Sequence, residues 1–282
     1  MHSRQRFALF ALAFLFTLMK GFAQQPAPPK GFVICYNPAV PSRKFASYKT
    51  LVVDYAYPPE AVAELRRQGK MVFGYLSLAK VHHQRPFASS VKSLGIEHEQ
   101  DPEFPGSYRV NAADPKWREL LVQSVVPRMK RLGFNGIFLD DLDDLKERKL
   151  EQYGISLMRD IRRANPEMKL MANRGLEYLT SYAPFVDFVL LESCFALDGQ
   201  LRKTADSEWA MGLLNAGKGI NPKLRGVAVD YIHRAVPEST VTGQYALTPS
   251  QSRLVNKIRQ LHTRNGLMSC VTTEDLQTVP DF

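Results

Sequence analysis

The stretch RLGFNGIFLDDLDDL, residues 131–145, contains the pattern that decides the fold. Gly133 ends a helical segment, a short apolar run from Phe134 to Leu139 follows it, and Asp140 stands directly after that run. A helix that stops at glycine, followed by a buried strand and then by polar residues, is typical of an α/β unit with parallel strands. Residues 131–145 therefore predict a strand that delivers a carboxylate to one edge of a sheet.

Seven further segments show the same kind of signal, a run of β-branched or apolar residues closed by polar or turn residues. Together with 134–139, the predicted strands are 32–36, 50–54, 70–77, 168–172, 185–191, 224–230 and 266–272. Helical patterns lie between them at 58–69, 114–133, 144–166 and 248–266. Repeated alternation of strand and helix predicts an α/β protein with a single (β/α)8 TIM barrel. An open doubly wound sheet is the alternative, but CYNPAVPSRK (35–44) is not the glycine-rich loop typical of that fold.

Capping residues mark the ends of two predicted helices. Asp114 and Thr248 each precede a proline, which predicts an N-cap followed by a first-turn proline. Pro127 lies inside 114–133 and predicts a kink in that helix. The segment 81–113 follows the third strand and is expected to be a long loop over the mouth of the barrel.

The N-terminus has the composition of a signal peptide. Two arginines precede the apolar run FALFALAFLFTLM (7–19), which is too short to span a bilayer, and small residues then suit cleavage after Ala23. We therefore predict a signal peptide at 1–23, a Pro-rich spacer at 24–31 and the barrel domain at 32–282. The mature protein is expected to be exported, periplasmic or secreted, and to have no integral membrane span.

Composition supports a globular protein. Of 282 residues, 45% are hydrophobic and 23% charged, which excludes collagen-like, disordered and disulfide-scaffold classes.

The formal charge is +9, and three basic residues without any acid in the signal peptide leave +6 for the rest. The remaining basic residues fall on predicted outer helices without a nucleic-acid-binding motif, so we expect no nucleic-acid partner. We expect a monomer.

The cysteines and histidines do not indicate a metal site or a cofactor. Cys35, Cys194 and Cys270 lie in or just after predicted strands, and none belongs to a CxxC pair. Because their number is odd, at least one is unpaired, and all three are expected to be buried small hydrophobic residues. His82 and His83 lack the neighbouring acids typical of a zinc site.

Four acidic residues stand directly after apolar runs: Asp54, Asp140, Glu192 and Asp230. In a barrel of parallel strands, these positions meet at the rim where catalytic residues are found. Side chains alternate along a strand, so each of the last three shares a face with the apolar residue two positions before it. A carboxylate that follows such a run is costly to bury without a partner, which makes Asp140 the strongest candidate for function.

Several other residues at the same rim are candidate substrate contacts, together with Asp230: Tyr75, Asp141, Asn173, Arg174 and Tyr231. A structural interpretation is also open for some of the rim residues. Asp54 could cap the helix that follows it, Asp143 and Asp144 suit a helix start, and Arg174 could neutralise neighbouring acids.

Most glycoside hydrolases use two carboxylic side chains that face one cleft. One must stay protonated to donate to the leaving oxygen, and the other must be ionised to attack the anomeric carbon or to activate water. Glu192 is our candidate for the proton donor and Asp140 for the nucleophile or base, with Asp54 orienting the substrate or stabilising positive charge. The residues alone leave the reverse assignment of donor and base open.

The chain also resembles a known family. RLGFNGIFLDDLDDL is similar to the GFDGVFLD-type block of the secreted TIM-barrel proteins of glycoside hydrolase family 114. Four other blocks resemble that family in the same order: LRRQGKMVFGYLSLAKV (65–81), YRVNAADPKWRELL (108–121), LMANRGLEYL (170–179) and FVDFVLLESCF (185–195). The resemblance spans about residues 32–275 and implies an endo-α-1,4-polygalactosaminidase whose partner is an amino-sugar polysaccharide.

Position by position, the resemblance implicates Asp54, Asp140 and Glu192, with Asn173 as a polar contact. The family usually has Gly-Glu after the third strand, whereas this sequence has Ala79–Lys80. A cation in place of an acid favours an alternative function, a non-catalytic or divergent barrel that binds an extracellular or envelope polysaccharide. We place the hydrolase first, because the remaining carboxylates still permit a two-carboxylate mechanism.

Overall fold

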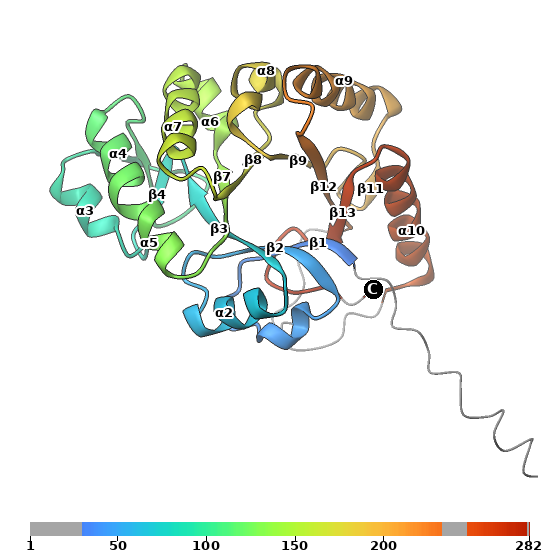
Figure 1. The fold of residues 1–282 in the computed structure, drawn as a ribbon. Helices are drawn as coiled ribbons and strands as arrows, with labels where there is room; N and C mark the ends of the chain where they lie inside the picture. Colours follow the sequence, from blue (N-terminus) through green and yellow to red (C-terminus); the bar gives the residue numbers. More distant parts are fainter. Residues whose placement is uncertain (1–29, 233–246, 281) are drawn as a thin grey trace, which may run out of the picture.

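The computed structural model describes residues 30–232, 247–280 and 282. Its central feature is one eight-stranded sheet in which each strand pairs in parallel with the next along the chain. The end strands of this order lie side by side, so the sheet forms a nearly closed barrel with helices around it (Figure 1). The barrel strands are β1 (Lys30–Cys35), β2 (Tyr48–Val53), β3 (Met71–Ser77), β7 (Gly136–Asp140), β8 (Lys169–Asn173), β9 (Phe188–Glu192), β12 (Arg225–Tyr231) and β13 (Met268–Thr272).

Each predicted strand overlaps one of these eight, and the (β/α)8 fold is confirmed. The predicted signal peptide lies outside the described residues, as do most residues of the spacer, whose last two belong to β1. The outer helices are α2 (Pro59–Arg67), α4 (Pro115–Leu120), α5 (Val126–Arg131), α6 (Leu142–Glu147), α7 (Glu151–Ala164), α8 (Leu179–Tyr182), α9 (Thr204–Ile220) and α10 (Pro249–Arg264). Short 3₁₀ helices lie at Ser42–Phe45, Leu176–Tyr178 and Ala183–Phe185. None of the described helices is long and apolar enough to cross a membrane.

Alternation along the strands divides the core into two layers. One set of side chains fills the barrel interior, among them Phe73 and Phe138, and the other set packs against the helices. Gly136 starts β7 without a side chain because a Cβ atom there would collide with the Phe73 ring. This close approach explains the glycine in the middle of the stretch FNGIFL that predicted the strand.

Both predicted N-caps are confirmed. Asp114 accepts a hydrogen bond of 2.8 Å from the backbone N–H of Lys116, and Thr248 forms a capping box with Gln251. The predicted helix 114–133 is not one α-helix but α4, a π-helical turn and α5, and Pro127 is the second residue of α5. A π-helical turn at Leu121–Val125 precedes it, in which the Val126 N–H bonds to the Leu121 carbonyl. A wider turn there accommodates a proline that has no N–H to donate.

The predicted helix 144–166 is instead two helices, α6 and α7. Lys149, with a φ of 57°, ends α6 in a left-handed conformation, and the Leu150 N–H bonds to the Leu145 carbonyl at 2.7 Å. This is the C-terminal arrangement that usually uses glycine. The sequence pattern missed the break because a lysine occupies that position.

The segment 81–113 is structured, not a loop. It contains α3 (Ala88–Ser93) and an antiparallel sheet of β4 (Lys80–His82), β6 (Ser107–Val110) and β5 (Glu97–Gln100). Side chains from this segment line the mouth of the barrel, so its expected position is confirmed. A second antiparallel pair, β10 (Ala196–Leu197) and β11 (Gln200–Leu201), follows β9.

Candidate active site

A cleft of about 650 Å³ opens at the carboxyl ends of the barrel strands. Its floor is formed by apolar side chains of the barrel interior, including Ile34, Phe138, Leu190 and Val229. Its walls come from the loops after the strands and from the segment 81–113. This is the face on which TIM-barrel enzymes carry their active sites.

Asp140 and Glu192 lie together in this cleft and are joined by one amide. The Asn173 Nδ2 donates to Asp140 Oδ1 at 2.8 Å and to Glu192 Oε2 at 3.2 Å. Because both oxygens bond to the same nitrogen, their separation is at most about 6 Å, which fits two carboxylates that share one glycosidic bond. The structure therefore brings together the two carboxylates and the amide that end β7, β9 and β8.

Two tyrosines hydrogen-bond to these carboxylates. The Tyr231 hydroxyl donates to Glu192 Oε1 at 2.7 Å, and the Tyr75 hydroxyl hydrogen-bonds to Asp140. Burial, and then the nearby carboxylate charge, raises the pKa of each tyrosine well above its usual value. Both hydroxyls therefore stay protonated and act as donors. Tyr75 and Tyr231 were predicted as substrate contacts, and both line the cleft.

Tyr36 is a further cleft residue that the sequence analysis did not single out. Its ring packs edge-on against Tyr75 with 5.2 Å between centroids. Burial, followed by the charges of Asp140, Glu192 and Asp54, raises its pKa well above the usual value. It directly follows the first strand, so the position at the rim that identified Tyr75 and Tyr231 as candidate contacts also indicates Tyr36.

Asp54 lies in the cleft but is held by an ion pair. Its Oδ1 is 2.7 Å from Arg85 Nη1, and the same oxygen accepts the Ala56 N–H at 2.7 Å. Arg85 also lies 5.2 Å from the centroid of the Tyr75 ring, a cation–π distance. Arg85 comes from the segment 81–113, and no sequence pattern connected it with Asp54.

Asp141 directly follows Asp140 at the end of β7, and its carboxylate faces Lys80. Its backbone has a φ of 65°, and its Oδ1 is 3.3 Å from Lys80 Nζ. Burial, and then the charge of Asp140, raises the pKa of Asp141 to about 7, although Lys80 and a hydrogen bond from Ser77 act in the opposite direction. Asp141 is therefore a proton-holding group beside one candidate catalytic residue.

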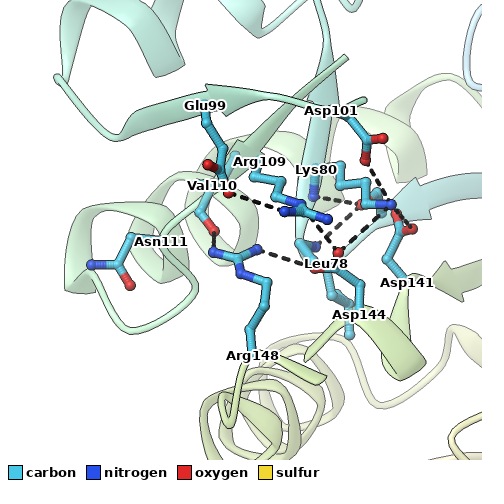
Figure 2. Close-up of polar contacts among 12 residues, drawn as sticks. Leu78, Lys80, Glu99, Asp101, Arg109, Val110, Asn111, Asp141, Asp144 and Arg148 are labelled. Carbon is cyan, nitrogen blue, oxygen red and sulfur yellow. Dashed lines mark hydrogen bonds and ion pairs between the residues drawn. The ribbon is translucent and has the colours of Figure 1, made fainter. Parts of the chain in front are cut away.

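Lys80 points into a cluster of carboxylates, as Figure 2 shows. Its Nζ is 2.8 Å from Asp101, 3.3 Å from Asp141 and 3.7 Å from Asp144. Burial lowers the pKa of Lys80, but the hydrogen bond to Asp101 and the three carboxylate charges outweigh burial and raise the pKa above its usual value. Lys80 is thus protonated, and the neighbouring carboxylates balance its positive charge.

Asp144 is the buried centre of this cluster (Figure 2). Besides Lys80, it lies 3.4 Å from Arg109 Nε and 3.1 Å from Arg148 Nη1. Arg148 also donates to the Val110 carbonyl at 2.9 Å. Asp144 is therefore not a solvated charge at a helix start. It ties α6 to the small antiparallel sheet and so fixes the wall of the cleft that carries Lys80.

Arg174 lies at the edge of the cleft, largely in solvent. Its Nε is 2.7 Å from Asp143, whose other oxygen accepts the Gly175 N–H at 3.0 Å. The pair leaves Arg174 able to face a ligand, because its side chain is 55% exposed. Neutralisation of a neighbouring acid, one of the two interpretations open for Arg174, is what this ion pair does.

Asp230 is not in the cleft. Its carboxylate is completely buried, accepts the N–H groups of Phe195 and Ala196 at 2.8 and 2.6 Å, and lies 2.6 Å from His262 Nε2. It does share a face with Ala228, but that face is the outer one, which packs against α10. The prediction of Asp230 as a substrate contact is corrected, because β12 extends one residue further and Tyr231 occupies the inner position.

The three cysteines are free thiols and buried, as expected. Burial raises the pKa of each to about 12, so they are unreactive. Within the part of the chain that the structure describes, no three His, Cys, Asp or Glu side chains are grouped so that they could hold a metal ion.

Residues 19–270 match the glycoside hydrolase family GH114. The chain belongs to glycoside hydrolase family GH114. An uncharacterized protein of Thermotoga maritima is 24% identical to this GH114 chain over 193 residues, which are 59% of the chain and 54% of that protein. The chain thus spans about half the length of this curated relative. The family to which the five sequence blocks pointed is confirmed.

Solved structures share the fold of this GH114 chain. The glycoside hydrolase domain of PelA from Pseudomonas aeruginosa matches with a TM-score of 0.68 and 23% identity, over 89% of this chain and 97% of that one. Aspergillus fumigatus Ega3, in complex with galactosamine, matches with a TM-score of 0.65 and 15% identity, over 92% and 96%. At these identities the likeness is one of fold.

Proposed function

We propose that this GH114 protein is a glycoside hydrolase that cleaves α-1,4-linked galactosamine-type polysaccharide. The observation that carries the proposal is the pair of carboxylates, Asp140 and Glu192, held by the Asn173 amide in a cleft at the barrel rim. A glycosidic oxygen placed between them has a carboxylic acid on one side and a carboxylate on the other.

In this mechanism, Glu192 donates a proton to the leaving oxygen and Asp140 acts as nucleophile or base. Tyr231 keeps Glu192 oriented, and Tyr75 does the same for Asp140. Asp54, fixed by Arg85, orients the substrate at the rim of the cleft. Contacts made by the chain's own side chains support these proposed roles.

The charge of the cleft favours a cationic sugar. Ten acidic residues line it against four basic ones, an excess of six acids in a protein whose overall charge is positive. The acids are Asp54, Glu103, Asp140, Asp141, Asp143, Asp144, Glu147, Glu192, Glu274 and Asp275, and the bases are Lys80, Arg85, Arg109 and Arg174. Such a cleft attracts the ammonium group of an amino sugar, because its walls focus one sign of charge.

Lys80 does not oppose this attraction, because Asp101, Asp141 and Asp144 surround it. One structure of the same fold, that of Ega3 in complex with galactosamine, supports an amino-sugar ligand. We also propose that residues 1–23 direct export, which fractionation of cells that express the full chain would test.

The decisive test is hydrolysis of partially deacetylated galactosamine polymers by the purified protein, beside Asp140→Asn and Glu192→Gln. We expect the wild type to release reducing ends and each variant to lose at least 100-fold in rate. Glu167→Gln is the matched control, because Glu167 is a surface acid paired with Lys130, away from the cleft. Polymer binding without release of reducing ends would contradict the proposal and assign the protein to the carbohydrate-binding alternative.

A further inference from the structure

A second hollow adjoins the cleft. It has a volume of about 520 Å³ and lies outside Glu192, between the loops after β8 and β9 and the start of α9. Four residues line both spaces: Asp143, Glu147, Arg174 and Glu192. The two spaces therefore adjoin at these four residues, on one side of the two carboxylates.

Trp209 stands at the outer wall of this second hollow. Asp206, Trp209 and Ala210 line it from one face of α9, at the spacing of residues that share a helix face. The Trp209 side chain is 54% exposed, whereas Trp117, the other tryptophan, is completely buried. Among the described residues, no aromatic ring stacks on Trp209.

Polar side chains line the same hollow, and its basic ones are paired with acids. Arg202 lies 3.2 Å from Asp206 and also donates to the Ser193 carbonyl at 3.2 Å. Lys146 pairs with Glu177 in the same hollow. The hollow therefore combines a half-exposed aromatic surface with hydrogen-bond donors and acceptors.

We propose that the second hollow binds sugar units of the polysaccharide chain that occupies the cleft, remote from the bond that is cleaved, with one ring stacked on Trp209. A pyranose ring fits this surface because its C–H face is apolar and its edge carries hydroxyl groups. The Arg202–Asp206 and Lys146–Glu177 pairs would bind those hydroxyls. The inference rests on the proposed function, since it takes the same polymer as ligand.

The position of the second hollow beside Glu192 gives the reason for this occupant. A chain bound between Asp140 and Glu192 can leave the cleft past Arg174, where the shared lining residues lead into the second hollow. Binding energy gained there is available only to ligands long enough to reach it. The protein should therefore favour long chains over short ones.

Intrinsic fluorescence tests binding without cleavage. We would titrate the Asp140→Asn variant with galactosamine oligomers of defined length, because Asp140 lines the cleft but not the second hollow. Since Trp117 is buried and donates to the Leu78 carbonyl at 2.9 Å, a spectral change reports on Trp209. We expect a shift of the emission and protection from iodide quenching with long oligomers, and the loss of both in Asp140→Asn with Trp209→Phe.

Kinetics test the length dependence. We expect Trp209→Ala to lower the ratio of kcat/KM on polymer to kcat/KM on the shortest cleaved oligomer about 10-fold, mainly through KM, and Trp209→Phe to restore most of it. Tyr153→Ala is the matched control, because Tyr153 is an exposed aromatic residue on α7 that lines neither space and should leave the ratio unchanged.

The outcomes separate this inference from the proposed function. An unchanged ratio in Trp209→Ala, together with emission that does not respond to long oligomers, would overturn the subsite while hydrolysis by the wild type still stood. A wild type that cleaves nothing, but whose Trp209 emission responds to long oligomers, would support the subsite and contradict the hydrolase.

Discussion

The Tyr231 hydroxyl donates a 2.7 Å hydrogen bond to the Glu192 carboxylate across the neighbouring ends of β12 and β9. The residue just before it, Asp230, points to the opposite side of the sheet and bonds to His262. Two adjacent residues of β12 therefore lie on opposite faces of the sheet, one in the barrel interior and one against the outer helices. The inner one serves the candidate site, and the outer one holds a helix and a loop to the barrel.

Replacing Tyr231 with phenylalanine should lower activity without loss of the fold. The change removes a hydroxyl and leaves the ring in place, so within the described part of the chain Glu192 keeps only its bond from Asn173. We expect kcat to fall about 10-fold, which corresponds to about 1.4 kcal/mol of transition-state stabilisation. Steady-state kinetics on polymer and thermal unfolding of both proteins would measure the two effects. An unchanged kcat would show that Tyr231 does not orient the carboxylate.

Replacing Asn173 should affect both candidate catalytic residues at once. Asn173→Ala removes the shared donor, so the two carboxylates face each other without a bridging N–H. We expect a loss of about 100-fold in kcat, more than for Tyr231→Phe, because one amide positions both groups. The double variant Asn173→Ala with Tyr231→Phe checks this coupling. If the two effects simply multiplied, the residues would act independently.

Asp230→Ala should lower the free energy of unfolding and leave the catalytic rate of the folded protein unchanged. The change leaves two backbone N–H groups and a buried histidine without their partner, at a cost of about 3 kcal/mol in the free energy of unfolding. Asp140→Asn should do the opposite, with activity lost and the free energy of unfolding changed by less than about 1 kcal/mol. Urea unfolding and kinetics at low temperature distinguish the two. A folded but inactive Asp230→Ala protein would return Asp230 to the active site.

Asp141 should make stability depend on pH. Its pKa in the folded protein is about 7, above the ordinary value of 3.8, so the folded state holds a proton that the unfolded chain has released. The free energy of unfolding therefore falls as the pH rises from about 4 to about 7, and this group contributes no further change above that.

The variant Asp141→Asn isolates this effect. Asparagine cannot ionise and tolerates the positive φ of 65° at this position. Melting temperatures at pH 5, 6, 7 and 8 should decline more for the wild type than for the variant. Parallel curves would show that Asp141 is ionised throughout this range.

The separation of the two carboxylates predicts the stereochemistry of hydrolysis. The oxygens of Asp140 and Glu192 that share the Asn173 amide are at most about 6 Å apart, which agrees with the separation of about 5–5.5 Å between the carboxyl groups of retaining glycosidases. We therefore expect retention of the anomeric configuration, which NMR of the first product formed would show. An inverted first product would mean that water, not Asp140, attacks the anomeric carbon.

Short-range patterns predicted most of the fold. The run GIFLD (136–140) forms a strand that ends at a carboxylate, and eight such strand signals in alternation with helices predict a barrel. The misses are local ones. Lys149 ends α6 at a position where glycine, the usual signal of a helix end, is absent. The strands within 81–113 are too short to give a recognisable pattern in the sequence.

Proximity of the candidate residues also followed from the sequence, because parallel strands in a barrel end on one rim. The common rim predicts that Asp140, Asn173 and Glu192 lie near each other. The inside or outside position of a residue near a strand end did not follow. A shift of one residue reverses it, which is why Asp230 was expected where Tyr231 lies.

The sequence by itself determined the barrel, its strand order and the acids at its rim, because these depend on hydrophobic period and chain order. Only the tertiary structure decided which partners those acids have. Arg85 reaches Asp54 from 31 positions away, and Lys80 meets Asp101 and Asp144 from separate elements. Contacts between side chains of distant segments depend on how the loops pack, and no local pattern of residues encodes that packing.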